Sequence, residues 1–561
     1  MTIPELTDSP PQELAASAPP GRRWRRVVGV LGLGVAAVGL FLGYLVMSRT
    51  EPVNADGASQ ALMAWDILHG NLLMSGWTVS DVSFYLTDVL IYVAVEAVYG
   101  LQADVVHVAA AVIYAVLVLV TLAVAKGRAR GRQAVVRIGL ALAIIAVPAA
   151  GVGSWVLLLS PDHTGTGIPL MLTWLVLDRG LTRSRVGEEP GRWLPYGITL
   201  LLAWGQVSDP LVTFIGAVPL VLVGAAGLWR DGRLRPREWR GPNAWFVAAG
   251  VGSFLIASCV HLVLRLAGGY TTHGLPFRFV ALSDLIENVK ITGQVLGVVF
   301  GAYFPDRDSP LAVVVGALHL VGLLAVGVVT VRTALRVVRR TGATDPLNEV
   351  MAVGLLGNVG AFVLSTLPAD MTTARQVAVT VPLGAALLAR TAGPWLASRR
   401  LATQRLLPAA TAVLLVFAGE FGVRVAAARS QPAANHDVAE WLEANDLSYG
   451  LGGFWTANNI TLIAGGRVRV AGITGRTEVF AYRWLSHTEW YDPERHDARF
   501  VVFDRNDPVA PAEEAVVARF GQPVRRQDFG RVTVLIYDHN LLVGLPAYCF
   551  PGRAPSMAEC D

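Results

Sequence analysis

Isolated acidic residues stand beside long apolar segments at several places in this sequence. Asp56 follows the first apolar segment, and Asp162, with His163 beside it, precedes another. Asp209 and Asp370 occupy similar positions further along the chain. Because an ionised carboxylate is costly next to a membrane core, each of these residues is a candidate for function. A carboxylate held near a reacting hydroxyl can act as a general base, so Asp56 and Asp162 are our candidate catalytic residues.

Helix capping is the simpler explanation for some of these carboxylates, because Asp is a preferred N-cap residue. Asp209 precedes Pro210, the usual order at the start of a helix, and we assign Asp209 to capping. Capping explains Asp56 least well, since the following segment carries further polar and aromatic groups. For Asp162, capping and catalysis both stay open.

Positive charge lies near the same segments. Arg375 follows Asp370 in the sequence DMTTAR. A guanidinium makes charge-assisted, bidentate contacts with phosphate, so Arg375 is a candidate phosphate ligand. His163 beside Asp162 is a candidate contact for phosphate or a metal ion, while a lone histidine is more often a hydrogen-bonded interfacial residue.

The composition indicates that lipid surrounds most of the chain. Of 561 residues, 53% are hydrophobic and 16% are charged, whereas soluble proteins are about one quarter charged. The net charge of +4 comes from arginines in short runs between apolar stretches, a pattern that argues against a nucleic-acid partner. We predict about eleven transmembrane helices within residues 27–427. The expected spans are residues 27–47, 104–125, 134–151, 164–178, 194–208, 211–228, 243–266, 311–331, 347–366, 377–391 and 405–427.

Arginine-rich runs occur in every second connection between these spans. By the positive-inside rule, the disordered tail 1–26 is cytoplasmic and the chain after Arg424 is extracytoplasmic. The protein is therefore expected to be a multi-pass protein of the cell membrane. This topology brings Asp56, Asp162 and Arg375 to the outer face.

Two segments outside the spans have structure of their own. The outer loop 48–103 shows helical periodicity at residues 57–69 and 82–100, and we expect these helices to be interfacial. Residues 430–561 are polar, with alternating helices and strands that predict a small extracytoplasmic α/β domain. Its strands are expected at Leu451–Trp455, Val468–Ile473, Phe500–Phe503 and Val532–Tyr537. We expect few apolar contacts between this domain and the spans.

Two further features of the tail leave alternatives open. Trp455 lies in an aromatic and polar cluster that suits stacking on a sugar, but packing within the domain and docking against the membrane part is the more common explanation for such residues. Cys549 and Cys560 form a disulfide only if their geometry allows it.

Together these features resemble the GT-C superfamily of membrane glycosyltransferases, which includes protein mannosyltransferases and aminoarabinose transferases. In that family the first outer loop carries an acidic residue and interfacial helices, as Asp56 and the segment Trp77–Tyr92 do here. Asp162-His163 matches the family's second acidic position, and Thr373-Ala374-Arg375 resembles its phosphate-facing segment. The resemblance implies a polytopic α-helical fold with an appended outer domain.

The same resemblance implies an activity. The sugar comes from a polyprenyl-phosphate carrier and is transferred, with inversion, to a glycan, lipid or protein acceptor. Asp56 and Asp162 are then catalytic, and Arg375 and His163 bind the donor phosphate. Trp77, Tyr85, Asp88 and Trp455 are expected to contact substrate.

A metal requirement stays open, because this chain has Asp-Gly where many relatives have Asp-Glu. If Mg²⁺ or Mn²⁺ is bound, Asp56, Asp162 and His163 are its expected ligands. Two other functions also stay open: a transporter or lipid flippase, and a non-catalytic envelope scaffold with an external binding domain. A transporter is expected to carry polar groups at the bilayer midplane and two related halves, neither of which the sequence displays.

Overall fold

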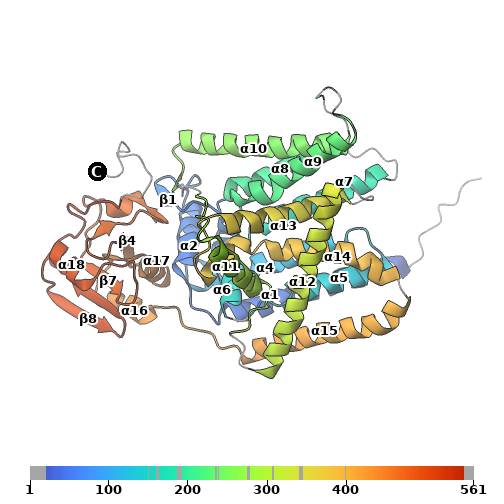
Figure 1. The fold of residues 1–561 in the computed structure, drawn as a ribbon. Helices are drawn as coiled ribbons and strands as arrows, with labels where there is room; N and C mark the ends of the chain where they lie inside the picture. The colour runs from blue at the N-terminus through green and yellow to red at the C-terminus, as the bar shows by residue number, and fades with distance from the viewer. Residues whose placement is uncertain are drawn as a thin grey trace, which may run out of the picture.

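The computed structural model describes residues 21–149, 151–159, 163–185, 193–233, 235, 237, 239, 241–273, 278–305, 309–339, 345–398 and 400–548. It contains a long helical bundle with a mixed α/β domain at one end (Figure 1). We call the bundle end nearest this domain the domain end, and the other the remote end. Residues 1–20 of the predicted tail 1–26, together with Asp162, Cys549 and Cys560, lie outside the described residues. Residues 21–26 are helical rather than disordered, because helix α1 begins at Gly21.

The bundle consists of helices that are mostly apolar. Their bounds are α1 (Gly21–Ser48), α4 (Asp104–Lys126), α5 (Gly131–Ile145), α6 (Val152–Leu158), α7 (Gly167–Arg185), α8 (Leu194–Ser208), η1 (Thr213–Ala217), α9 (Val218–Arg230), α10 (Pro242–Leu266), α11 (Leu285–Val299), α12 (Pro310–Arg339), α13 (Pro346–Leu364), η3 (Met371–Val377), α14 (Thr380–Ser398) and α15 (Arg400–Ala427). Among the described residues, seven helices are long and apolar enough to cross a membrane. The bent pair η3 and α14, with a 52° bend, raises this number to eight.

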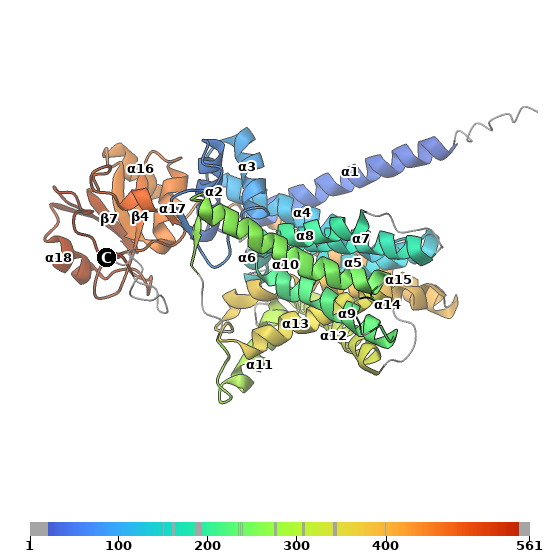
Figure 2. The same cartoon turned by 90° about the horizontal axis from the view of Figure 1, so that it is seen from above.

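The remaining predicted spans also coincide with helices. α5 and α8 have 15 residues each and α7 has 19, and none meets the length and hydropathy of a membrane crossing. They pack against neighbouring helices of the bundle: α5 on α14, α7 on α4 and α8 on α10. The two views show them running alongside longer helices (Figures 1 and 2). The count of eleven crossings therefore stays a prediction, while a multi-pass helical membrane protein is supported.

The loop between α1 and α4 folds at the domain end. It contains α2 (Ala55–Leu68), β1 (Trp77–Val79) and α3 (Asp88–Tyr99), close to the helices predicted there. Asn54 caps α2 by accepting a hydrogen bond from the backbone N–H of Gly57 at 2.8 Å. The cap of α2 is thus Asn54, and the carboxylate of Asp56 is left for other contacts.

The C-terminal domain is a six-stranded mixed sheet with helices. Its elements are α16 (His436–Ala444), β3 (Tyr449–Gly453), α17 (Phe454–Ile463), β4 (Arg469–Thr474), β5 (Phe480–Ala481), β6 (Ser486–His487), η4 (Thr488–Tyr491), β7 (Phe500–Asp504), α18 (Glu513–Phe520), β8 (Arg525–Phe529) and β9 (Val532–Ile536). The order is β5-β4-β3-β7-β9-β8, with β3 parallel to β4 and β7. Trp455 lies in helix α17 rather than in the predicted strand, because β3 ends at Gly453.

The contacts of this domain with the bundle are more extensive than the polar linker predicts. β6 pairs with β1 of the first loop, and β1 pairs with β2 (Thr271–Thr272), so one small sheet joins three distant segments. Helix α17 packs on α2, where the Asn458 amide donates to the Ser59 hydroxyl at 2.7 Å. The domain is therefore fixed over the loop that carries Asp56.

Candidate functional site

Asp56 and Arg375 meet at the domain end of the bundle. Arg375 Nη1 lies 3.3 Å from Asp56 Oδ2, although the two residues are 319 positions apart. The side chain of Asp56 is 15% exposed and that of Arg375 is 33% exposed, so the pair is accessible. The two residues that the sequence analysis selected as base and phosphate ligand are therefore neighbours.

The position of Arg375 depends on the short 3₁₀ helix η3. Asp370 caps this helix by accepting hydrogen bonds from the backbone N–H of Thr372 at 2.8 Å and from its hydroxyl at 2.5 Å. The hydroxyl bond is the main cause of the lowered pKa of Asp370. Asp370 is thus an ionised cap that orients the segment bearing Arg375.

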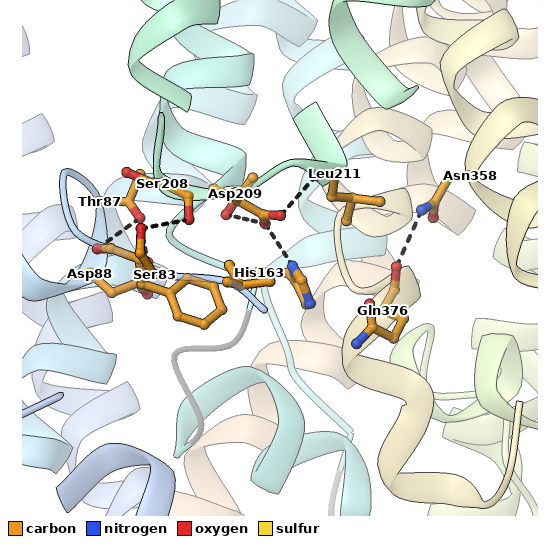
Figure 3. Close-up of polar contacts among 12 residues, drawn as sticks. Ser83, Thr87, Asp88, His163, Ser208, Asp209, Leu211, Asn358 and Gln376 are labelled. Atoms are coloured by element: carbon orange, nitrogen blue, oxygen red, sulfur yellow. Dashed lines mark hydrogen bonds and ion pairs between the residues drawn. The ribbon is translucent and has the colours of Figure 1, made fainter. Parts of the chain in front are cut away.

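His163 is buried against Asp209 in a second close pair. His163 Nδ1 lies 2.6 Å from Asp209 Oδ2, and the Thr166 hydroxyl donates to the same oxygen at 2.7 Å. Asp209 Oδ1 accepts from the backbone N–H of Leu211 at 2.9 Å (Figure 3). Burial alone raises the pKa of Asp209, but the charge and hydrogen bond of His163 and the other donors outweigh it and lower the pKa.

These contacts correct the assignment of Asp209 to capping alone. Asp209 does contact the start of the next helical segment through Leu211, as predicted. However, its other carboxylate oxygen holds His163, and both side chains are at most 4% exposed. Asp209 is therefore a buried partner of a candidate site residue, and His163 is not free to face a ligand through Nδ1.

Asp81 also belongs to this region, although it is not among the site residues predicted from the sequence. Its loop is fastened to the end of α8: the backbone N–H of Phe84 donates to Ser208 O at 3.0 Å, and that of Leu86 to the Ser208 hydroxyl at 2.9 Å. Burial raises the pKa of Asp81; His163 opposes this effect, Asp209 adds to it and Arg375 opposes it more weakly. Asp81 is thus within electrostatic range of both pairs.

A cavity of about 830 Å³ opens beside Asp81. Its walls carry the hydroxyl groups of Ser83, Tyr270 and Thr272. His261 and Arg265 of α10 add two basic side chains, and Leu262 adds apolar surface. Many hydroxyls together with a carboxylate and basic groups suit a polar ligand such as a sugar or a phosphate.

The C-terminal domain contributes to the same region through Tyr482. Burial chiefly raises the pKa of Tyr482 to about 12, and Tyr548 and the carboxylate of Asp56 add to the increase. Tyr482 therefore lies near Asp56. No local sequence signal connects these two residues, since a folded domain has to dock before they meet.

The predicted substrate-binding residues lie in other environments. Trp77 is 2% exposed, and its indole N–H donates to Asp66 at 2.7 Å. Asp88 is fully buried behind Gly165 and accepts a hydrogen bond from the Thr87 hydroxyl at 2.7 Å. Both side chains are buried, so in this structure neither is exposed to a substrate, and their predicted role stays a prediction.

The two remaining predicted contacts are accessible. Tyr85 is half-buried and donates its hydroxyl to Leu72 O at 2.5 Å. Trp455 is 43% exposed on α17 and packs edge-on against Phe454. Of this pair, Trp455 has the larger free surface.

The comparisons with known proteins add no identification. No known protein-family model matches this sequence. No curated protein matches it either. The functional argument therefore depends on the geometry of this chain.

The expected metal site is not assembled among the described residues. There, no three His, Cys, Asp or Glu side chains are placed to hold a metal ion. Asp56 pairs with Arg375, and His163 Nδ1 pairs with Asp209, so these two expected ligands have separate partners. Asp162, the third ligand named for a possible metal, lies outside the described residues, so the metal requirement stays open. The chemistry that the described side chains support is acid–base and electrostatic.

Proposed function

We propose that this protein is a membrane glycosyltransferase that uses a polyprenyl-phosphate-linked sugar. The observation that carries the proposal is the accessible Asp56–Arg375 pair. Arg375 also acts electrostatically on Asp81, which lines the cavity. A candidate base and a candidate phosphate ligand are adjacent at one end of an apolar bundle. A donor with a lipid tail and a charged headgroup suits this position, because its tail needs lipid and its phosphate needs a cation.

In the proposed reaction, Arg375 exchanges Asp56 for the donor phosphate. Asp56 then accepts the proton of an acceptor hydroxyl, and the hydroxyl oxygen forms a bond with C1 of the sugar. The bond between C1 and the phosphate oxygen breaks, and the leaving polyprenyl phosphate takes the electron pair. Arg375 neutralises the charge that develops there. One displacement of this kind inverts the anomeric configuration.

The buried His163–Asp209 pair forms part of the structural framework of this site. Asp209 fixes one imidazole nitrogen and thereby the ring orientation. His163 also opposes the rise that burial causes in the pKa of Asp81, which favours the charged carboxylate in the cavity. We assign Asp81 to contact with the acceptor or the sugar hydroxyls, because it faces the cavity.

We further propose that the domain end of the bundle is extracytoplasmic. The arginine-rich connections predict this orientation. A reporter enzyme fused after the last residue is expected to be active outside the cytoplasm. A cytoplasmic C-terminus would place the Asp56 site on the wrong side for the proposed reaction.

The direct test is transfer by the purified protein. Incubation with radiolabelled polyprenyl-phospho-sugars is expected to release or transfer labelled sugar, and Asp56→Asn is expected to abolish it. Donor binding without turnover in the wild-type protein would instead favour a flippase. Absence of both binding and turnover with every donor offered would remove the proposal.

A further inference from the structure

A groove of about 1040 Å³ lies at the remote end of the bundle, far from the Asp56 site. It is bounded by α1, α4, α5 and α7. The end of α4 at Lys126 is remote from the domain, because α4 begins at Asp104 beside the first loop, where Arg49 binds Asp104. Helix α7 begins at Gly167, shortly after His163, and its later residues line this groove. Both views show α7 extending away from the C-terminal domain (Figures 1 and 2).

The rim of the groove is basic. Lys126, Arg128 and Arg179 line it, and all three are exposed. Among the described residues, no acidic side chain forms an ion pair with any of the three. Within the described part of the chain, the Arg128 guanidinium donates to the backbone carbonyl of Arg179 at 3.3 Å, a contact that brings the two cations together without neutralising either.

The acidic residue that lines the groove has another partner. Asp178 Oδ1 lies 2.6 Å from Nη2 of Arg390, and both side chains are at most 10% exposed. Arg390 is held in place by Asp345 at 2.8 Å and by the carbonyl of Val124 at 3.1 Å. The carboxylate of Asp178 is thus held in a buried network, and the described side chains that line the groove carry a surplus of positive charge.

The walls below the rim are apolar. Leu33 of α1, Leu122 of α4, Ile138 of α5 and Leu175 of α7 line the groove. Trp193 stands at its edge, 82% exposed, in ring contact with Tyr196. Exposed Trp and Tyr side chains at helix ends are typical of the membrane interface. The groove therefore combines a cationic rim at headgroup depth with walls that face acyl chains.

We propose that this groove binds one anionic phospholipid. Lys126, Arg128 and Arg179 bind the headgroup phosphate, and the apolar walls of α1, α4, α5 and α7 hold the acyl chains. A basic pocket between membrane helices is suited to such a headgroup, whereas a zwitterionic lipid adds a positive charge that the rim repels. The site is independent of the sugar-transfer proposal, since it lies at the other end of the bundle.

Native mass spectrometry of the purified protein tests the proposal. The protein is equilibrated with equal amounts of phosphatidylglycerol and phosphatidylcholine, and the lipids retained are counted. The wild-type protein is expected to retain phosphatidylglycerol preferentially. Lys126→Gln, Arg128→Gln and Arg179→Gln are each expected to weaken this preference by about fivefold, the contribution of one cation near an anionic surface.

Arg336→Gln on α12 is the matched control. Arg336 is exposed and lies outside the groove, so its replacement removes the same charge without touching the rim. This variant is expected to behave as the wild type. Equal retention of both lipids by the wild type would overturn the proposal, as would equal effects of Arg128→Gln and Arg336→Gln.

A second measurement covers the case in which the rim variants fail to fold. Phosphatidylglycerol with brominated chains is expected to quench the Trp193 fluorescence of the wild-type protein, measured as the difference from Trp193→Phe. Brominated phosphatidylcholine is expected to quench it less. Millimolar inorganic phosphate is not expected to relieve the quenching; relief would identify a free-phosphate site and overturn the lipid assignment, as would equal quenching by both lipids.

Discussion

The Nδ1 atom of His163 lies 2.6 Å from a carboxylate oxygen of Asp209, in a pair that is almost fully buried. Asp209 comes from the end of α8, and His163 from the segment that leads into α7. The pair therefore links two helices beside the loop of Asp81, where Phe84 contacts the His163 ring and the backbone N–H of Leu86 donates to the Ser208 hydroxyl. It makes His163 part of the scaffold of the site.

Replacement of Asp209 by Asn is expected to destabilise the protein. The amide keeps the side-chain volume but loses the charge and one acceptor, so His163 or Thr166 is left without its buried partner. Such a loss costs about 1–3 kcal/mol. Thermal unfolding of the purified protein measures it, with Asp231→Asn as the control, since Asp231 is exposed. Equal melting temperatures of the two variants would mean that the contact with His163 adds no stability and that Asp209 acts only as a helix cap.

Asp56 and Arg375 are expected to give different kinetic signatures. Asp56→Asn removes a proton acceptor of nearly the same size, so transfer should fall by about a hundred- to ten-thousand-fold while donor binding persists. Arg375→Ala removes the phosphate partner and should weaken donor binding. Binding of labelled donor and turnover are measured in parallel. Full activity in Asp56→Asn would make Asp81 and Asp162 the next candidates for the base.

The sequence predicted these two residues but not their contact. Carboxylates and arginines beside apolar segments are visible locally, and the topology placed both on one face. The ion pair itself joins positions 319 apart, and only the packed bundle brings them together. Asp209 was misjudged for the same reason: its local cap signal is real, but its partner His163 is 46 residues away.

Trp77 illustrates a different limit of the sequence. A tryptophan next to polar residues suits a sugar as well as it suits a packed interface. The deciding fact is the docking of β6 on β1, which surrounds Trp77 with His487 and Trp490 of the C-terminal domain. The helices, by contrast, follow from local apolar length and periodicity, and their positions were predicted closely.

Trp77→Ala is expected to loosen the C-terminal domain. The change removes a buried ring that contacts Trp490 at 5.2 Å between centroids, and such a deletion costs about 3–5 kcal/mol. Limited proteolysis near residue 430 should become faster. Trp455→Ala is the control, because Trp455 is 43% exposed. Comparable proteolysis of the two variants would show that Trp77 is not part of the interface.

Asp81→Asn is expected to stabilise the protein at neutral pH. Partial burial raises the pKa of Asp81 above its ordinary value of 3.8, so the charged form is disfavoured in the folded state. Because the residue is still exposed to solvent, screening keeps the expected advantage of the variant small. The protonated Asp81 of the wild-type protein therefore contributes stability that is fully present below the unfolded-state pKa. This contribution to the free energy of unfolding is lost as the pH rises through the folded-state pKa. Melting temperatures between about pH 4 and pH 8 should show an advantage of Asp81→Asn that disappears towards acid pH. An advantage that is constant over this range would exclude titration of Asp81 as its cause.

Gly165→Ala is expected to disturb the site through Asp88. A Cβ atom at position 165 would lie 2.5 Å from Oδ1 of Asp88, which is fully buried and begins α3. The carboxylate has no open space to move into, and overpacking of this kind costs about 1–3 kcal/mol. Position 165 lies between His163 and Thr166, so the strain should also reduce transfer. Gly293→Ala is the matched control: Gly293 is exposed on α11, and a Cβ there meets nothing within 4 Å. That variant should be stabilised by about 0.5–1 kcal/mol, because Ala is the better helix residue.

A Gly165→Ala protein as stable as the Gly293→Ala protein would contradict this prediction. It would mean that the segment before α7 can shift without cost and that its position does not depend on contact with Asp88.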